Sequence, residues 1–467
     1  MSGLRTLGAR LATLALVLGV WFWPPPEGLG LPAWRLFAIF VAAIFSVVAG
    51  ALPIFTASVL AVAAAVLSGI LPAADAYAGF GNGTILLIVV AFLVASAVVK
   101  CGLGVRAGHW IVALFGRSTL GLSYSIFLLD AAIAPAFPSN TARSGVLYPL
   151  AFSLASAAGA QPGGAARPRL GAFLMFSGIA SLSVSSALWL TAMAANPLGT
   201  EIARRFGVEI GFGSWLIASS VPTLVAMALL PIVLYRVVRP EVQSTPEAPA
   251  AARKALAALG PLSRDEKIVL AVFVGMVALW ASAATFGLDS TAIAFLGLGV
   301  LLATGVMTSA DIAGQGDVLA TFIWFAVLFT LSSQLNTLGF MGFLGERLAG
   351  GLGGLAAPTA GLVLVLAYIL LHYLFVSQTA HLLALFGVFL GVGVKLGVNP
   401  TVLALQLLFA TNYFSGITPQ GSSANLLFAG SGYLSQRDLY RLGAITTAVS
   451  MLVYFVVGTA WLMLVAR

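Results

Sequence analysis

Long runs of apolar residues fill most of this chain, and short polar or Pro- and Gly-rich breaks separate them. Many runs approach the roughly 20 residues that an α-helix needs to cross a bilayer. Strand-type alternation is absent, which argues against a transmembrane barrel. The pattern predicts an all-α polytopic membrane protein with apolar segments at residues 8–23, 34–51, 53–73, 83–100, 119–138, 142–158, 170–198, 213–239, 267–286, 288–307, 319–337, 357–376, 379–397, 400–432 and 445–466.

Composition agrees with a membrane protein. Of 467 residues, 60% are hydrophobic and 8% are charged, against about 25% charged in a soluble protein. Mean hydropathy is +1.07. The single cysteine, Cys101, excludes an intrachain disulfide and a Cys-rich metal site. The run 11–23 resembles a signal peptide but lacks a small-residue cleavage site, so residues 1–33 are predicted to hold a retained first helix.

The two halves of the chain resemble each other. Ser139 and Ser377 lie 238 residues apart in similar motifs, and the run 190–196 has a counterpart at 419–425. Gly102 and Gly339, each after an apolar helix, form a further pair. Repeats of this kind are common in secondary transporters. We therefore expect the following order along the chain: the first helix at 1–33, repeat 1 at 34–239, a polar cytoplasmic linker at 240–266 and repeat 2 at 267–467.

Two polar islands interrupt the apolar runs, PSNTAR at 138–143 and SQTAH at 377–381. The flanking segments form either separate spans or two re-entrant hairpins, at 119–158 and 357–397. Unpaired backbone is tolerated at membrane depth only where it is buried in protein or lines a wet cavity, and hairpins satisfy that condition. Each half then holds five spans and the second half is inverted, which with the first helix gives about 11 transmembrane helices.

The distribution of positive charge supports one orientation of this topology. With the N-terminus cytoplasmic and the C-terminus outside, fifteen Lys and Arg residues fall inside and six fall outside. Positive residues favour the cytoplasmic side, which also explains the net charge of +8 without a nucleic-acid partner. The inside set is Arg5, Arg10, Lys100, Arg106, Arg117, Arg167, Arg169, Arg236, Arg239, Arg253, Lys254, Arg264, Lys267, Arg437 and Arg441, and the outside set is Arg35, Arg204, Arg205, Arg347, Lys395 and Arg467.

Polar groups for chemistry are confined to the islands and to two interrupted helices, at 170–205 and 400–432. Free N–H groups at a helix break favour carboxylates, and unwound carbonyls can hold Na⁺. No phosphate-binding Gly-rich loop is present, and the three histidines have no metal-ligand spacing. An intramembrane enzyme would need a catalytic dyad or metal cluster, and the sequence offers neither. A channel would not need two matched islands.

The motifs PSNTAR, SQTAH and GITPQGSSANLLFAGSGYLSQRDLYRLG resemble the divalent-anion/sodium symporter family. They are most similar to its branch of bacterial citrate, tartrate and succinate exchangers and plastid oxoglutarate/malate translocators, over most of the chain from about Phe80 to Gly443. The resemblance implies a homodimeric elevator-type transporter with two hairpins in the bacterial inner membrane, in contact with lipids. It also implies that the protein uses no cofactor and transports small organic acid anions.

By position, the resemblance implies a substrate site at Ser139, Asn140, Thr141, Ser377, Gln378, Thr379, Gly421, Ser422 and Ser423, with Ser185, Ser186 and Thr191 as further candidates from the first helix break. It also implies a first Na⁺ site at Ser139 and Asn140. Two features depart from the sodium-coupled pattern. Gln378 stands where symporters have Asn, and Arg143 and His381 stand four residues after the paired serines, where symporters have small residues.

These departures lead to a hypothesis about coupling. Arg143 and protonated His381 would replace the charge of Na⁺, and an empty carrier would then move an uncompensated cation through the membrane, which is costly. The protein would be an obligatory exchanger of C4–C6 di- or tricarboxylates. A Na⁺-coupled dicarboxylate symporter and a sulfate transporter stay open as alternatives.

For Asp130, in an apolar hairpin arm, three roles stay open: pairing with Arg143, coordinating a cation and relaying a proton.

Overall fold

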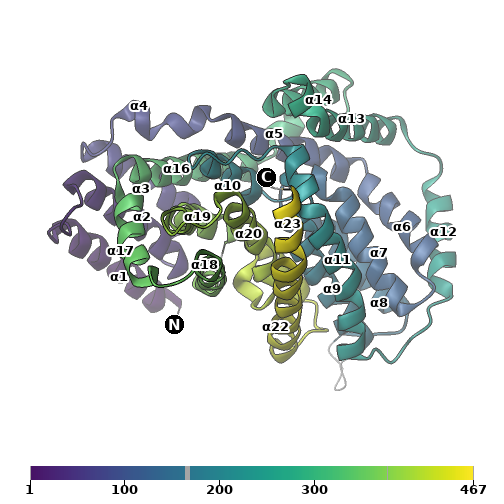
Figure 1. The fold of residues 1–467 in the computed structure, drawn as a ribbon. Helices are drawn as coiled ribbons and strands as arrows, with labels where there is room; N and C mark the ends of the chain where they lie inside the picture. The colour runs from purple at the N-terminus through teal and green to yellow at the C-terminus, as the bar shows by residue number, and fades with distance from the viewer. Residues whose placement is uncertain (1, 163–168, 376, 466–467) are drawn as a thin grey trace. The chain divides into compact units, whose positions relative to one another are not determined.

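The computed structural model describes residues 2–162, 169–375 and 377–465, and helices dominate this part of the chain (Figure 1). It contains no β-strand, only one isolated β-bridge between Ser118 and Ser244. Ten of the described helices are long and apolar enough to cross a membrane. The number rises to eleven if α17 (Phe340–Leu352) and α18 (Ala357–His372), which meet at 117°, form one bent span. The predicted all-α multi-pass fold is confirmed.

A few positions used in the sequence analysis lie outside the described residues. They are Arg167 and Arg467 of the charge count, the rest of 163–168 in repeat 1, and residues 376 and 466 in repeat 2.

One of two compact units runs to Val89 and also takes in Leu198–Glu209 and Gly314–Leu407. It contains α17 and α18 together with α1 (Ser2–Phe22), α2 (Leu31–Val48), α3 (Ile54–Leu67), α4 (Ala73–Ala76), η1 (Ala78–Gly81), α16 (Gly316–Thr337) and α19 (Gln378–Lys395). Three more helices are divided between the units: α5 (Gly83–Lys100), α10 (Ala195–Arg204) and α20 (Pro400–Tyr413).

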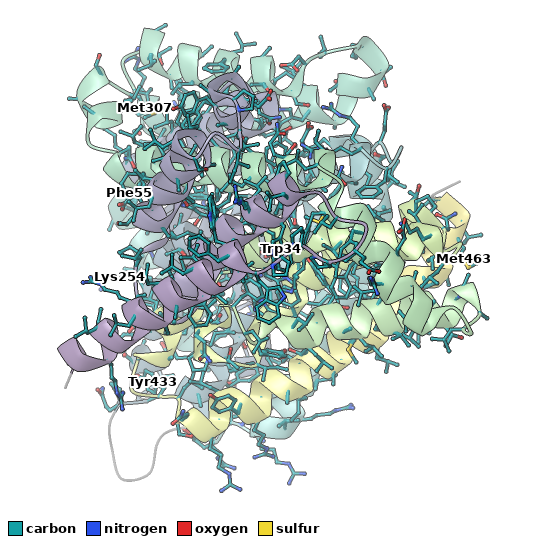
Figure 2. The ribbon with its side chains drawn as sticks, turned by 90° about the vertical axis from the view of Figure 1, so that its left-hand side faces the viewer. Trp34, Phe55, Lys254, Met307, Tyr433 and Met463 are labelled. Atoms are coloured by element: carbon teal, nitrogen blue, oxygen red, sulfur yellow. The ribbon has the colours of Figure 1, made fainter. Side chains whose placement is uncertain are left out.

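Aromatic stacking and close backbone approach hold this unit together. Trp34, labelled in Figure 2, stacks on Phe37 at 5.6 Å, and Phe37 stacks on Phe340 of α17 at 4.3 Å. The turn η1 meets α16 so closely that a Cβ on Gly79 would lie 2.3 Å from the carbonyl oxygen of Ala326. Only glycine fits there, because any side chain would strike backbone.

The second unit comprises Val90–Pro197, Ile210–Ala313 and the chain from Leu408 onward. Its elements are α6 (Leu103–Phe115), α7 (Thr119–Ile133), η2 (Ala134–Ala136), α8 (Asn140–Ala157), α9 (Arg169–Leu188), η3 (Leu190–Ala192), α11 (Phe212–Val238), α12 (Glu247–Leu259), α13 (Arg264–Phe286), α14 (Ser290–Ala303), α15 (Ser309–Ala313), η4 (Phe414–Gly416), η5 (Pro419–Gly421), α21 (Ser423–Ala429), α22 (Gln436–Val453), the π-turn η6 (Tyr454–Gly458) and α23 (Thr459–Val465).

The centre of the second unit is α9, in which every residue from Leu170 to Leu188 is buried. It packs against α7, α8 and α11, which lie beside it in Figure 1. Small residues make the close packing possible: a Cβ on Gly178 would lie 2.3 Å from the ring of Phe428. A helix enclosed on all sides must satisfy its own polar side chains, and Ser177 does so by donating to the carbonyl of Phe173 at 2.8 Å.

The polar linker at 240–266 contains a helix, α12, which packs along α6. Its Ala-rich sequence has high helix propensity. Arg106 of α6 is 5% exposed and forms a two-point ion pair with Glu266, at 2.6 and 3.1 Å. The same guanidinium donates to the carbonyls of Leu259 and Gly260 at the end of α12. This clasp fixes the linker helix in place.

The two halves share local structure at the positions paired by sequence. Gly102 and Gly339 both adopt left-handed backbone, with φ of 78° and 87°, and each precedes a 13-residue helix. Ser139 and Ser377 both cap a following helix. The flanking helices pack as pairs, α7 with α8 and α18 with α19. The described residues thus repeat the same turn chemistry at nearly constant offset.

Candidate functional site

A buried arginine lies at the centre of the candidate site. Arg143 in the first turn of α8 and Asp130 of α7 are both fully buried. Arg143 Nη1 donates to Asp130 Oδ1 and to Ser185 Oγ, both at 2.8 Å. Arg143 Nη2 donates to Asn140 Oδ1 at 2.6 Å and to Ser186 Oγ. Of the three roles considered for Asp130, the structure shows the ion pair with Arg143.

The sequence-based picture of Arg143 as an uncompensated cation is therefore wrong. Asp130 lies 2.8 Å from the guanidinium, and Ser185 Oγ donates to the second carboxylate oxygen at 2.5 Å. Breaking such a pair is costly, whereas the intact pair with its hydrogen bonds offsets much of the cost of burial. The charge of Arg143 alone thus gives no barrier to movement of an empty carrier.

Local sequence explains how the three helices bring these groups together. α7 ends at Ile133, and the 3-10 turn η2 leads the chain into α8. Ser139 then caps α8, because its hydroxyl accepts the N–H of Ala142 at 3.2 Å. The cap fixes the first turn of α8. Arg143, four residues after Ser139, then lies next to Ser185 and Ser186 of α9.

Asn140 turns its two amide ends toward different neighbours. A guanidinium only donates, so the atom that faces Arg143 is the amide oxygen. The same oxygen lies 2.7 Å from Ser186 Oγ. The amide nitrogen lies 3.8 Å from Met193 Sδ, in the extended stretch after η3. The donor end of Asn140 therefore faces the first interrupted helix.

The tip of the first island meets the second interrupted helix. Thr141 Oγ1 and Ser423 Oγ lie 2.8 Å apart, and both residues are exposed. Ser422 is buried and stands at the N-cap position of α21, although its side chain makes no capping bond. A Cβ on Gly421 would lie 2.5 Å from the carbonyl oxygen of Ser415, so only glycine fits in this turn. These predicted site residues thus come together with Asn140 and Arg143 in one unit.

The first interruption is fastened by two polar side chains. Thr191 Oγ1 donates to the carbonyl of Pro135 at 2.9 Å and joins η3 to the hairpin turn. Asn196 Nδ2 donates across the break to the carbonyls of Ser186 at 2.8 Å and Trp189 at 3.3 Å. Sequence reasoning paired Asn196 with Asn425 but assigned neither a role.

The second interruption repeats this arrangement. Asn425 Nδ2 donates to the carbonyls of Ser415 at 2.8 Å and Thr418 at 3.1 Å, ten and seven residues back, which is also the spacing at Asn196. Asn412 links the two breaks, since its Nδ2 donates to Asn196 Oδ1 at 2.9 Å. An asparagine at the matching end of both motifs was the sequence signal for this role.

The second island belongs to the other compact unit and is described by itself. Ser377 caps α19 by accepting the N–H of Ala380 at 3.3 Å, as Ser139 caps α8. Gln378 and Thr379 follow in the first turn and are 6% and 9% exposed. His381, one turn in, is fully buried. The motif therefore has the same local form as the first island.

His381 lies in an aromatic cluster rather than in a cluster of charges. Its ring centroid is 4.3 Å from that of Tyr368, 5.0 Å from that of Phe375 and 5.4 Å from that of His372. The two histidines meet across the α18–α19 pair, which their sequence spacing did not predict. Within the described ranges, no group of three or more His, Cys, Asp or Glu side chains could hold a metal ion.

The many apolar spans, the two capped polar turns and the two interrupted helices define a class: a multi-pass membrane protein built like a secondary carrier. The family profile described as "Sodium:sulfate symporter transmembrane region" matches residues 5–467. The chain therefore belongs to this family, the divalent-anion/sodium symporters, as the sequence motifs predicted.

Relatives and one solved structure agree with this assignment. The chain is 39% identical to YflS of Bacillus subtilis (strain 168), provisionally named a malate transporter, over 97% of this chain and 95% of that one. It is 38% identical to "Dicarboxylate transporter 2, chloroplastic" of Spinacia oleracea, over 97% and 82%. The structure of the Alcanivorax borkumensis YdaH transporter has a similar fold, with a TM-score of 0.59 at 16% identity, covering 98% of this chain and 97% of that one.

Proposed function

We propose that this protein is a secondary carrier for C4–C6 di- or tricarboxylates. The observation that carries the proposal is the meeting of Thr141 and Ser423, whose hydroxyls lie 2.8 Å apart in exposed positions beside buried Asn140. Hydroxyl and amide donors bind a carboxylate without a net charge of their own. Asn140 and Thr141 stand in the first turn of α8, where the helix dipole favours an anion, and Ser423 is the first residue of α21. Relatives named for malate and dicarboxylate transport support the substrate class.

We propose exchange without Na⁺ as the coupling mode. The first Na⁺ site of the family would need oxygens from Ser139 and Asn140. Here Asn140 Oδ1 accepts from Arg143 at 2.6 Å, and Ser139 Oγ accepts from the N–H of Ala142. Asn140 Oδ1 also accepts from Ser186, so both of its lone pairs face donors and one of these donors is a guanidinium, which disfavours a cation at that place. Because Asp130 already neutralises Arg143, obligatory exchange needs a source other than the lone charge first considered.

The remaining parts of the proposal concern the assembly. We place the protein in a bacterial inner membrane as a homodimer that works by an elevator motion, with the N-terminus cytoplasmic, the C-terminus outside and lipids around it. The excess of Lys and Arg on the loops assigned to the cytoplasm supports the orientation. The inverted repeats are proposed from the matched turns at Gly102 and Gly339 and the matched caps at Ser139 and Ser377.

Uptake into proteoliposomes tests the substrate class. Vesicles preloaded with one di-acid should take up labelled malate, and excess succinate, citrate, tartrate or oxoglutarate should compete. Ser423→Ala removes one exposed hydroxyl and should raise the half-saturation concentration several-fold, whereas Ser220→Ala, at an exposed hydroxyl of α11, should not. Competition by sulfate alone would instead support an inorganic dianion transporter.

A further inference from the structure

The network around Arg143 fixes one specific group, the carboxamide of Asn140. The two terminal nitrogens of Arg143 make four hydrogen bonds, to Asp130, Ser185, Asn140 and Ser186. All five side chains are buried. A planar guanidinium reaches this many acceptors in fixed directions, which an ammonium does not. The arrangement therefore sets direction as well as charge.

Within this network, Asn140 is the member that comes from the first polar island and stands next to Thr141 of the candidate substrate site, whereas Ser185 and Ser186 are candidates from the first helix break. Arg143 Nη2 lies 2.6 Å from its amide oxygen, and Ser186 Oγ lies 2.7 Å from the same atom. Rotating the amide by a half-turn would bring its NH₂ group against the NH₂ group of Arg143, which is repulsive. The oxygen is thus held toward Arg143, and the nitrogen is held toward Met193 and the first interrupted helix.

Asp130 binds both Arg143 and Ser185 of this network. Its Oδ1 accepts from Arg143 at 2.8 Å and its Oδ2 accepts from Ser185 at 2.5 Å. Ser185 in turn accepts from Arg143 at 2.8 Å, so the carboxylate, the hydroxyl and the guanidinium close a ring of hydrogen bonds. This ring holds the plane of the guanidinium and compensates its charge.

We propose that Asp130 and Arg143 are positioning residues, which hold the Asn140 carboxamide with its N–H donors toward the substrate carboxylate. The inference rests on the proposed function, since it names what a buried ion pair does for that site. Arg143 then acts through Asn140, and not by direct attraction of the anion. The same orientation withholds the Asn140 oxygen from any cation.

A double-mutant cycle, measured by transport in proteoliposomes, tests whether Arg143 acts through Asn140 or attracts the anion directly. Arg143→Lys keeps the positive charge but cannot reach Asp130 and Asn140 in the same geometry. We expect it to raise the half-saturation concentration of the di-acid at least ten-fold. Asn140→Ala should raise it similarly, and the double variant should be no worse than either single variant, because both changes remove one interaction. Arg204→Lys, at an exposed arginine paired with Glu201, is the matched control and should behave as wild type.

Two outcomes of the transport assays overturn the inference. If Arg143→Lys transports as wild type, charge is sufficient and positioning is not needed. If the effects of Arg143→Lys and Asn140→Ala add, Arg143 acts on the anion independently of Asn140. Should Arg143→Lys not fold, Asp130→Asn combined with Arg143→Gln replaces the ion pair by neutral groups of similar shape and takes its place in the cycle. This double variant should also raise the half-saturation concentration at least ten-fold.

A structure of Arg143→Lys provides a test that is independent of transport. The inference requires the Asn140 carboxamide to rotate or to lose its single conformation. An unchanged Asn140 side chain contradicts the inference whatever the transport assays give. Conversely, if wild-type protein exchanges no organic di-acid, the proposed function fails, and this structural arm still judges whether Arg143 positions Asn140.

Discussion

Substituting the asparagines of the two interrupted helices tests whether their side chains stabilise the helix breaks. Asn196 Nδ2 donates to the carbonyls of Ser186 at 2.8 Å and Trp189 at 3.3 Å, while its oxygen accepts from Asn412. Asn196→Asp replaces the NH₂ group by an oxygen at nearly the same size. The bond from Asn412 survives, but both carbonyls lose their donor and face a carboxylate oxygen instead.

The magnitude follows from those two carbonyls. A buried acceptor left without a partner costs about 1–3 kcal/mol, so the two together cost about 2–6 kcal/mol. At about 2 °C per kcal/mol for a domain of this size, the melting temperature should fall by at least about 4 °C. Repulsion between the new carboxylate and the carbonyls increases the effect, because the side chain is fully buried.

Thermal unfolding of the purified protein in detergent measures this change. Asn425→Asp should destabilise similarly, since Asn425 makes the same two bonds to Ser415 and Thr418. Asn399→Asp is the control: there the side-chain oxygen accepts two backbone N–H groups at the start of α20, which an aspartate also does. If Asn196→Asp melts at the same temperature as wild type, the asparagine does not stabilise the first helix interruption and the reasoning is refuted.

Two further predictions concern stability elsewhere in the second unit. Gly443→Ala should destabilise by about 1–3 kcal/mol, because its Cβ would lie 2.3 Å from the carbonyl oxygen of Gly416, whereas Gly275→Ala, with nothing within 4 Å, should not lower the melting temperature. Glu266→Gln removes the charge partner of buried Arg106 and should lower the free energy of unfolding by about 3–5 kcal/mol. The loss should be seen as faster proteolysis within α12, whose C-terminal end Arg106 binds. Cleavage at the wild-type rate would show that the Arg106–Glu266 pair does not hold that helix.

Local features of the site were accessible from sequence. The serines at 139 and 377 cap helices because Ser before a helical run is a short-range signal, and the glycines at 102 and 339 take the left-handed backbone expected after a helix. Repetition at nearly constant offset made these signals stronger than either motif alone. The all-α multi-pass fold was accessible because many apolar runs approach the length that a helix needs to cross a bilayer.

Tertiary contacts were not accessible from sequence. Whether Asp130 pairs with Arg143 depends on how α7 and α8 pack against α9, which hydropathy does not specify. The contact of His372 with His381 depends on the angle between two helices. The linker at 240–266 was taken as polar connection only, and its helix packs on α6 through Arg106, which resembled an ordinary loop charge in the sequence.

The central claim is a carboxylate carrier that exchanges its substrate without sodium. The most direct measurement is uptake of labelled di-acid into proteoliposomes under four conditions, with or without internal di-acid and with or without an inward Na⁺ gradient. We predict uptake only when internal di-acid is present, at the same rate with and without Na⁺. Uptake driven by the Na⁺ gradient into vesicles that contain no di-acid would contradict the account.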